Sequence, residues 1–257
     1  MAVWEVFAPR RKRSHSRLAR WPSNIAISVF NTLVLRVVLP SGVVGLALLA
    51  QTQGWGLLNA VDLPSWVSIV AAILILDFVI YLQHVIFHAV PLLWRFHRMH
   101  HADLDIDVTT GARFHPVEII LSILIKLAAV AALGPPVVAV VMFEVLLNAT
   151  SMFNHSNARL PLALDRVLRL IVVTPDMHRV HHSVIPAETN SNFGFNVPCW
   201  DRLCGTYKAQ PREGHDGMTI GIEQFREPRE LLIDRMLTQP ARGTTSGYPL
   251  GRRGPDA

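Results

Sequence analysis

The chain has 257 residues, of which 51% are hydrophobic and only 17% are charged, and its mean hydropathy is +0.32. A composition this apolar excludes an ordinary water-soluble globular domain. The formal charge of +5 does not indicate nucleic-acid binding, because the basic residues gather at the chain ends and between apolar runs, as they do in membrane proteins.

Residues 1–23 form a basic N-terminal segment, which we expect to lie in the cytosol. The first twenty residues have no apolar core, so they do not resemble a removable signal peptide. Six of them are basic: Arg10, Arg11, Lys12, Arg13, Arg17 and Arg20.

Four apolar runs follow, and they predict an all-α, multi-pass membrane bundle. They occupy residues 24–50, 64–90, 116–133 and 136–153. A bilayer core needs roughly 20 apolar residues in a helix, so the first two runs are long enough to span. The last two are shorter and are separated only by Gly134 and Pro135. The bundle therefore has either four spanning helices or two hairpins, and for the second hairpin both a spanning and a re-entrant form fit the sequence.

The charges of the loops predict how the bundle is oriented. Residues 51–63 contain no Lys or Arg, and the turn at Gly134 has no charge, whereas every other connection is basic. By the positive-inside rule, both termini and both large loops lie in the cytosol.

Beyond the last run we expect a cytosolic helical cap over residues 160–238. Residues 160–174 have an apolar face and a charged face, which predicts an interfacial helix that ends before Pro175. Residues 239–257 are rich in Gly, Pro and Arg, and this composition predicts a disordered tail.

The histidines carry the main functional signal, since ten of the twelve lie between positions 84 and 182. Residues at i, i+3 and i+4 share one face of a helix, so each group can direct its imidazoles to one point. Imidazole binds iron, zinc and copper, and eight or nine such ligands imply two ions. Cys199 and Cys204 have no partner pair that would support a thiolate site. The clusters are His84 and His88; His97, His100 and His101; and His178, His181 and His182.

This pattern of HxxxH, HxxHH and HxxHH boxes resembles the fatty acid hydroxylase superfamily, which includes sterol desaturases, C-4 methyl sterol oxidases and alkylglycerol monooxygenases. The segments TTGARFHPVE (109–118) and NSNFGFNVPCWDRLCGTY (190–207) are also similar to those that follow the boxes in such proteins. The resemblance covers roughly residues 60–210. It implies a membrane-embedded oxygenase with two non-haem iron ions, O₂ as co-substrate and electrons from an external donor.

The histidines outside the boxes have different expected roles. His155 resembles the extra ligand that such families supply from the end of the last membrane helix. His115 is either a tenth ligand or a group behind the ligands, and the sequence leaves both open. His15 and His215 lie outside the pattern, and we expect them to be solvated.

Four ionisable residues lie toward the middle of the membrane runs: Arg36, Asp77, Lys126 and Glu144. Such residues are usually paired or functional. Lys126 and Glu144 lie at similar depth, as do Arg36 and Asp77, so one interpretation is two buried ion pairs.

The other interpretation of these residues is a pocket. Asp77 and Tyr81 share a helix stripe with the first histidine box, and Glu144 and Asn148 share another with His155. Both stripes lead from mid-membrane to the histidines. They predict a partly polar pocket beneath the metals, or groups that orient the imidazoles.

The sequence thus predicts a membrane oxidoreductase that hydroxylates or desaturates a lipid such as a sterol or a fatty acid. No haem, flavin or nicotinamide motif is present, so a reductase and an electron carrier are expected as partners, and nucleic acid is not. Two alternatives stay open. One is a histidine-bound zinc hydrolase acting on lipid esters, and the other is a membrane protein that binds metal without catalysis.

Overall fold

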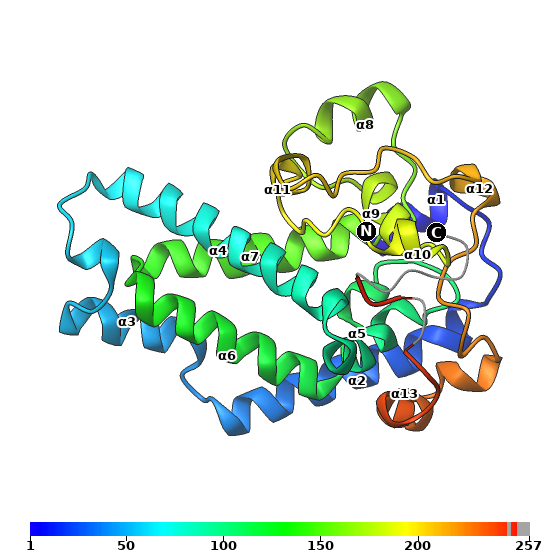
Figure 1. The fold of residues 1–257 in the computed structure, drawn as a ribbon, viewed down its shortest axis with the longest axis horizontal. Helices are drawn as coiled ribbons and strands as arrows, with labels where there is room; N and C mark the ends of the chain where they lie inside the picture. Colours follow the sequence, from blue (N-terminus) through cyan, green and yellow to red (C-terminus); the bar gives the residue numbers. More distant parts are fainter. Residues whose placement is uncertain (246–247, 251–257) are drawn as a thin grey trace.

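The computed structural model describes residues 1–245 and 248–250, and over these residues the regular elements are all helices. Five long helices form a bundle, and the shorter helices gather at one end of it (Figure 1). We call that end the cap. The bundle helices are α2 (Arg17–Val38), α3 (Gly42–Gln53), α4 (Ser65–Ala89), α6 (Pro116–Leu133) and α7 (Val137–Asn154).

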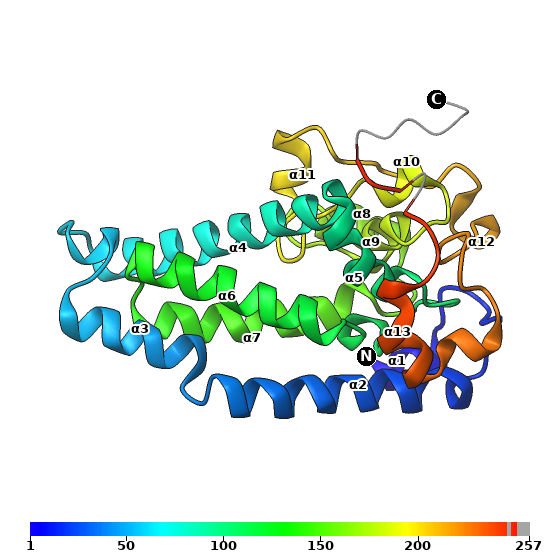
Figure 2. The same ribbon diagram turned by 60° about the horizontal axis from the view of Figure 1, so that its bottom comes forward.

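Four segments of the described chain are long and apolar enough to cross a membrane, as the sequence predicts. The first of them is not one continuous helix. It breaks between α2 and α3 at Pro40, which has no backbone N–H to continue the helical hydrogen bonds. As a result α3 steps away from the line of α2 toward the other helices (Figure 2).

At the end of the bundle far from the cap, two glycines allow two turns of the chain to approach each other closely. The short 3₁₀ helix η1 (Leu57–Asn59) follows α3 there, and α6 and α7 are joined by a tight turn. Gly134 caps α6 with a positive φ of 61°. A Cβ atom on Gly56 would lie 2.2 Å from the Gly134 nitrogen, so only residues without a side chain fit at this contact.

The core of the bundle is apolar and so is much of its surface. Buried side chains of α3, α4, α6 and α7 pack together, among them Ala47, Leu76, Val130 and Phe143. The opposite faces of the same helices expose large apolar side chains such as Trp66, 70% exposed, and Val145, 64% exposed. Faces of this kind are stable against lipid rather than water.

The cap is built from α1, α5 and the helices that follow α7. Their bounds are α1 (Ala2–Phe7), α5 (Pro91–His101), η2 (Thr110–Ala112), α8 (Leu162–Leu168), α9 (Pro175–His181), α10 (Pro186–Thr189), α11 (Cys199–Leu203), α12 (Gly214–Gly217), η3 (Pro228–Leu231), α13 (Ile233–Thr238) and η4 (Gln239–Ala241). The predicted interfacial helix is α8, and it ends earlier than expected, whereas Pro175 begins α9. Its charged Asp165 is buried while its apolar Val167 is 57% exposed, so the apolar face points outward.

The basic N-terminal segment is packed into the cap. Arg20, at the start of α2, is fully buried and its guanidinium donates to both carboxylate oxygens of Asp103 at 2.7 Å and to Asp107 at 2.6 Å. The buried Glu5 of α1 accepts hydrogen bonds from the backbone of Val108 and Asn157. These contacts fix the loop that follows α5.

The described part of the predicted disordered tail is instead ordered against α5. Arg98 donates to the backbone oxygens of Gln239, Arg242 and Thr244. Tyr248 is buried and its ring stacks on Trp94 with centroids 5.5 Å apart. The composition of the segment did not predict this packing, because the contacts involve its carbonyl groups and one aromatic ring. Residues 246–247 and 251–257 lie outside the described part of the chain.

Candidate metal centre

Four segments bring nine buried histidines to one place where the bundle meets the cap. Helix α4 ends with His84 and His88, and α5 carries three histidines in its second half. The residue after α7 is His155. Helix α9 begins at Pro175, where the side chain of Thr174 caps it. The third box lies at the C-terminal end of this helix.

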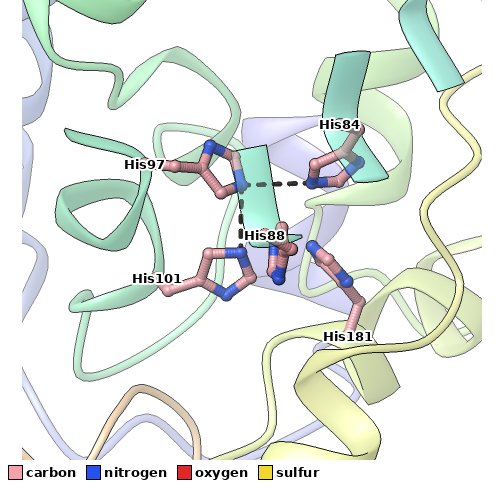
Figure 3. A group of neighbouring side chains, drawn as sticks. All are labelled: His84, His88, His97, His101 and His181. Atoms are coloured by element: carbon pink, nitrogen blue, oxygen red, sulfur yellow. Dashed lines mark hydrogen bonds between the residues drawn. The ribbon is translucent and has the colours of Figure 1, made fainter. Parts of the chain in front are cut away.

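The nine histidines divide into two groups that do not follow the boxes. In each group the candidate ligand atoms lie within 4.8 Å of one another. The five-histidine group, shown in Figure 3, consists of His84, His88, His97, His101 and His181. The four-histidine group consists of His100, His155, His178 and His182.

Each HxxHH box therefore serves both groups, and the two boxes do so in opposite ways. In α5, His97 and His101 are four residues apart and join the five-histidine group, while His100 turns to the other. In α9 the pair spaced by four joins the four-histidine group and His181 crosses over. The two groups touch, because the rings of His101 and His182 stack with centroids 4.7 Å apart.

Ring nitrogens within each group face one another at about hydrogen-bond distance, and for neutral rings the His84–His97 pair cannot hydrogen-bond. Nδ1 of His84 faces the oxygen of Phe193 at 2.7 Å and Nδ1 of His97 faces Glu118, so both Nδ1 atoms carry the proton. Their two Nε2 atoms are then unprotonated acceptors, yet they lie 3.1 Å apart. In the other group Nε2 of His155 lies 3.1 Å from Nε2 of His100 and of His178.

A metal ion bound between these nitrogens would turn the unfavourable contact into coordination. Metal–imidazole bonds of about 2.1 Å that meet near right angles place their nitrogens roughly 3 Å apart. The facing nitrogens, all at buried positions, therefore have the spacing of ligands around an ion. The residues present fit a centre for two metal ions.

Hydrogen bonds behind the ligands set the direction of several imidazoles. Besides His84 and His97, three further rings direct Nδ1 to an oxygen and leave Nε2 for the centre. The contacts are His88 to the side chain of Asn190 at 3.1 Å, His155 to the oxygen of Ser151 at 2.7 Å and His181 to the oxygen of Ser191 at 2.7 Å.

The cap histidines are held neutral, which is the form that binds metal. Burial lowers the pKa of His100, His101, His178, His181 and His182 well below the ordinary value, and neighbouring imidazoles lower each pKa further. A neutral imidazole has a free lone pair at pH 7.

The remaining histidines lie outside both groups. His115 caps α6 with Nδ1, and its Nε2 donates to the oxygen of Leu237 at 3.2 Å, so both ring nitrogens are already in use. His15 is half-buried beside Ser14. His215 is buried in the cap, 3.6 Å from Asp176, so the expectation that it is solvated is wrong.

A cavity of about 430 Å³ extends from the histidines into the bundle. It reaches His84 and His97 at the cap end, and its walls come from α2, α4, α6 and α7. The predicted Glu144 and Asn148 line it, and the Nζ atom of Lys126 lies 2.6 Å from Oε1 of Glu144, as one of the two predicted ion pairs.

The second predicted ion pair is wrong. Asp77 accepts a hydrogen bond from the indole of Trp200 at 2.8 Å, and Arg36 is exposed on α2. Tyr81 bonds to the hydroxyl of Thr206 at 3.0 Å. Asp77 and Tyr81 are thus not among the cavity's lining residues, and instead hold the segment that follows the last box.

Sequence reasoning missed Glu118, although a signal was present. It is an acidic residue near the start of the third apolar run, where an ionisable side chain is usually paired or functional. Its Oε1 lies 2.6 Å from Nδ1 of His97. The partners of His84 and His181 are backbone carbonyls, for which a sequence carries no signal.

Comparisons with known proteins identify relatives of this chain. An ornithine lipid hydroxylase of Rhizobium tropici is 32% identical over 149 residues, which cover 58% of this chain and 44% of that protein. The human alkylglycerol monooxygenase is 28% identical over 178 residues, covering 68% and 37%. Methylsterol monooxygenase 2-2 of Arabidopsis thaliana is 27% identical over 164 residues, covering 62% and 61%.

These three relatives are named as a hydroxylase and two monooxygenases, and the chain spans less than half the length of the first two. No solved structure matches the chain significantly. The family profile described as fatty acid hydroxylase matches residues 69–206, which is more than half of the chain and includes all nine clustered histidines. The chain belongs to the fatty acid hydroxylase family.

Proposed function

We propose that the protein is an integral-membrane monooxygenase that holds two iron ions in the two histidine groups and oxidises a lipid with O₂. One observation carries the proposal: nine buried imidazoles direct ring nitrogens at one another, 3.1 Å apart in both groups, at the end of a cavity inside the helical bundle. The similarity to lipid hydroxylases and monooxygenases supports it.

The reaction needs a redox metal. Acid–base groups do not break an unactivated C–H bond, and two iron ions, when bound, supply the required electron and oxygen chemistry. In hydroxylation, R–H, O₂, two electrons and two protons give R–OH and water. In desaturation, a CH–CH unit with the same reactants gives an alkene and two waters.

The donor set favours iron over zinc. Protein zinc sites are almost always four-coordinate, and catalytic zinc keeps one of those positions for water. The five-histidine group offers more imidazoles than zinc takes, and neither group contains a thiolate. Imidazole ligation with additional positions suits iron.

The chain's own residues hold and shield the centre. Glu118 and the backbone oxygens of Ser151, Phe193 and Ser191 keep the imidazoles directed inward. The cavity walls of Ile80, Ile123 and Leu147 accept the apolar part of a lipid and keep bulk water away.

We further propose that both termini and the histidine centre face the cytosol. The cap carries the basic segments, while the loop of residues 51–63 at the other end has no Lys or Arg. Reducing equivalents then reach the centre from a cytosolic reductase and electron carrier, since the sequence contains no flavin, haem or nicotinamide motif.

Metal analysis combined with ¹⁸O₂ labelling tests the proposal. The protein is purified for metal analysis, and lipids are extracted from cells that express either the wild type or His181→Ala and that are grown under ¹⁸O₂. We expect about two iron ions per chain and a lipid that gains ¹⁸O, or loses two hydrogens, only with the wild type.

Two results would overturn it. Zinc with full activity in the absence of oxygen would establish the hydrolase alternative. Bound metal without any lipid product that depends on His181 would establish a non-catalytic metal-binding protein.

A further inference from the structure

The cavity wall nearest the histidines has unpaired hydrogen-bond acceptors. Glu118 is 4% exposed, and its Oε1 accepts from His97 while its Oε2 has no partner among the described residues. Asn31 is 6% exposed, and its Oδ1 is likewise unpartnered within the described chain. Both side chains line the cavity.

The identity of the unpaired atom in Asn31 is settled by its neighbour. The amide of Asn31 lies 2.9 Å from the backbone oxygen of Phe114, which accepts only, so the amide nitrogen faces it and the amide oxygen is free. Gln83 adds a third acceptor in the same wall, because its Nε2 donates to Ser122 and its Oε1 is unpartnered among the described residues.

All three side chains lie beside the histidines. Glu118 contacts His97 directly, and Gln83 precedes His84 in the chain. Asn31 holds the backbone of Phe114, whose ring stacks on His100 with centroids 4.4 Å apart. The three residues come from α2, α4 and α6, so they belong to three different walls of the cavity.

Several other polar groups of the cavity wall have partners. Ser151 donates to the oxygen of Gly111 at 3.2 Å, the amide nitrogen of Asn148 donates to the oxygen of Glu144 at 2.7 Å, and Lys126 is paired with Glu144. The buried acceptors of Asn31 and Glu118, by contrast, need donors. A plain hydrocarbon chain there would leave buried acceptors without partners, which is unfavourable.

We propose that the lipid segment that lies against the histidines carries hydroxyl or N–H donors, which Asn31, Gln83 and Glu118 accept. The substrate class is then a polar lipid that enters with its hydroxyl- or amide-bearing end, and not a fatty acyl chain attacked at mid-chain. This rests on the proposed function in that it places the substrate in this cavity, but it concerns recognition and can be measured without turnover.

The test is competitive binding of two matched lipids. N-palmitoylethanolamine has one N–H and one O–H donor, and its N-methyl, O-methyl derivative has the same chain and no donor. The full-length, metal-loaded protein in detergent micelles is mixed with equal amounts of both, and native mass spectrometry determines which lipid stays bound. We expect the wild type to prefer the donor-bearing lipid about tenfold, as two neutral hydrogen bonds allow.

Variants show which side chains cause the preference for the donor-bearing lipid. Asn31→Leu and Gln83→Met are each expected to lower this ratio. The double variant, which leaves Glu118 as the one acceptor of the three, is expected to lower it to about threefold, because one of the two hydrogen bonds is lost. Gln53→Met is the matched control, since Gln53 is exposed at the end of α3 and does not line the cavity, and it should keep the wild-type ratio. Gln83→Met decides the matter if Asn31→Leu disturbs Phe114 and loses metal.

Equal retention of the two lipids by the wild type, or preference for the methylated one, would overturn the inference. The same samples, supplied with a reductant and ¹⁸O₂, separate it from the proposed function. A donor preference without oxygenation contradicts the proposed function only, whereas oxygenation without a donor preference contradicts the inference only.

Discussion

Nδ1 of His97 lies 2.6 Å from Oε1 of Glu118, and both side chains are buried at the junction of α5 and α6. The carboxylate accepts the Nδ1 proton, which leaves Nε2 of His97 directed at its neighbours in the five-histidine group. Glu118 also lines the cavity, so one side chain links the predicted metal centre to the predicted substrate site.

Replacing Glu118 is expected to weaken metal binding. Groups that orient a ligating histidine typically contribute 10- to 100-fold to metal affinity, so Glu118→Ala should lower iron affinity by about that factor. Titration with a chelator and measurement of iron per chain would check it. Glu144→Gln, which removes a membrane carboxylate that contacts no histidine, is the control. Unchanged iron affinity in Glu118→Ala would contradict the role of this carboxylate.

His100 and His101 are adjacent in the chain but belong to different groups. Alanine at the two positions is therefore expected to change the metal content differently. His101→Ala leaves four imidazoles in its group, whereas His100→Ala leaves three. We expect His100→Ala to lose about one iron ion per chain and His101→Ala to retain more of its metal, although both reduce product formation by at least about 100-fold. Metal analysis and lipid mass spectrometry measure the two effects.

His15→Ala serves as the control for that pair, because His15 lies outside both groups. Equal metal loss from the two alanine variants would show that the nine histidines form one site and not two.

The Lys126–Glu144 pair is expected to stabilise the hairpin of α6 and α7. Removing one partner of a buried pair costs about 3–5 kcal/mol, and the lower end applies here because the Glu144 side chain is 28% exposed. Lys126→Met should therefore lower the thermal unfolding temperature more than the double variant with Glu144→Leu. If both variants unfold like the wild type and turnover alone falls, the pair acts on the substrate rather than on stability.

His215 is expected to make the cap sensitive to acid. Burial lowers its pKa to about 4 from an unfolded value near 6.5, although Asp176 opposes this and Arg179 and Arg10 favour it. Between these values the unfolded chain binds a proton that the folded chain does not, so the free energy of unfolding rises with pH and is lost as pH falls from about 6.5 to 4.

The largest contribution of His215 is about 3 kcal/mol, from a difference of roughly 2.5 pH units. Melting of the detergent-solubilised wild type and His215→Gln at several pH values would isolate it, because the clustered histidines are common to both proteins. The variant should lose less stability than the wild type between pH 6.5 and 4. Parallel curves would show that His215 does not cause the acid sensitivity.

The sequence by itself determined the helical bundle, the four candidate membrane segments, the family and the nine histidines that meet. Apolar length predicts a membrane helix because the bilayer thickness is constant, and spacing by three and four residues places side chains on one helix face whatever the surroundings. Spacing also offered the pairing of Glu144 with Lys126 as one of two interpretations, because a tight turn fixes the relative depth of both helices, and the structure contains this pair.

Only the tertiary structure decided how the histidines divide, what Asp77 contacts and where residues 239–245 and 248–250 lie. Box spacing gives a direction relative to one helix axis, whereas membership of a group depends on how α5 and α9 approach each other. Because Arg36 and Asp77 lie at equal depth, one interpretation paired them. Depth does not specify how each helix is rotated about its axis, and in the structure Asp77 accepts a hydrogen bond from Trp200 instead. The C-terminal segment is held by backbone carbonyls, which every residue possesses and no sequence pattern reports.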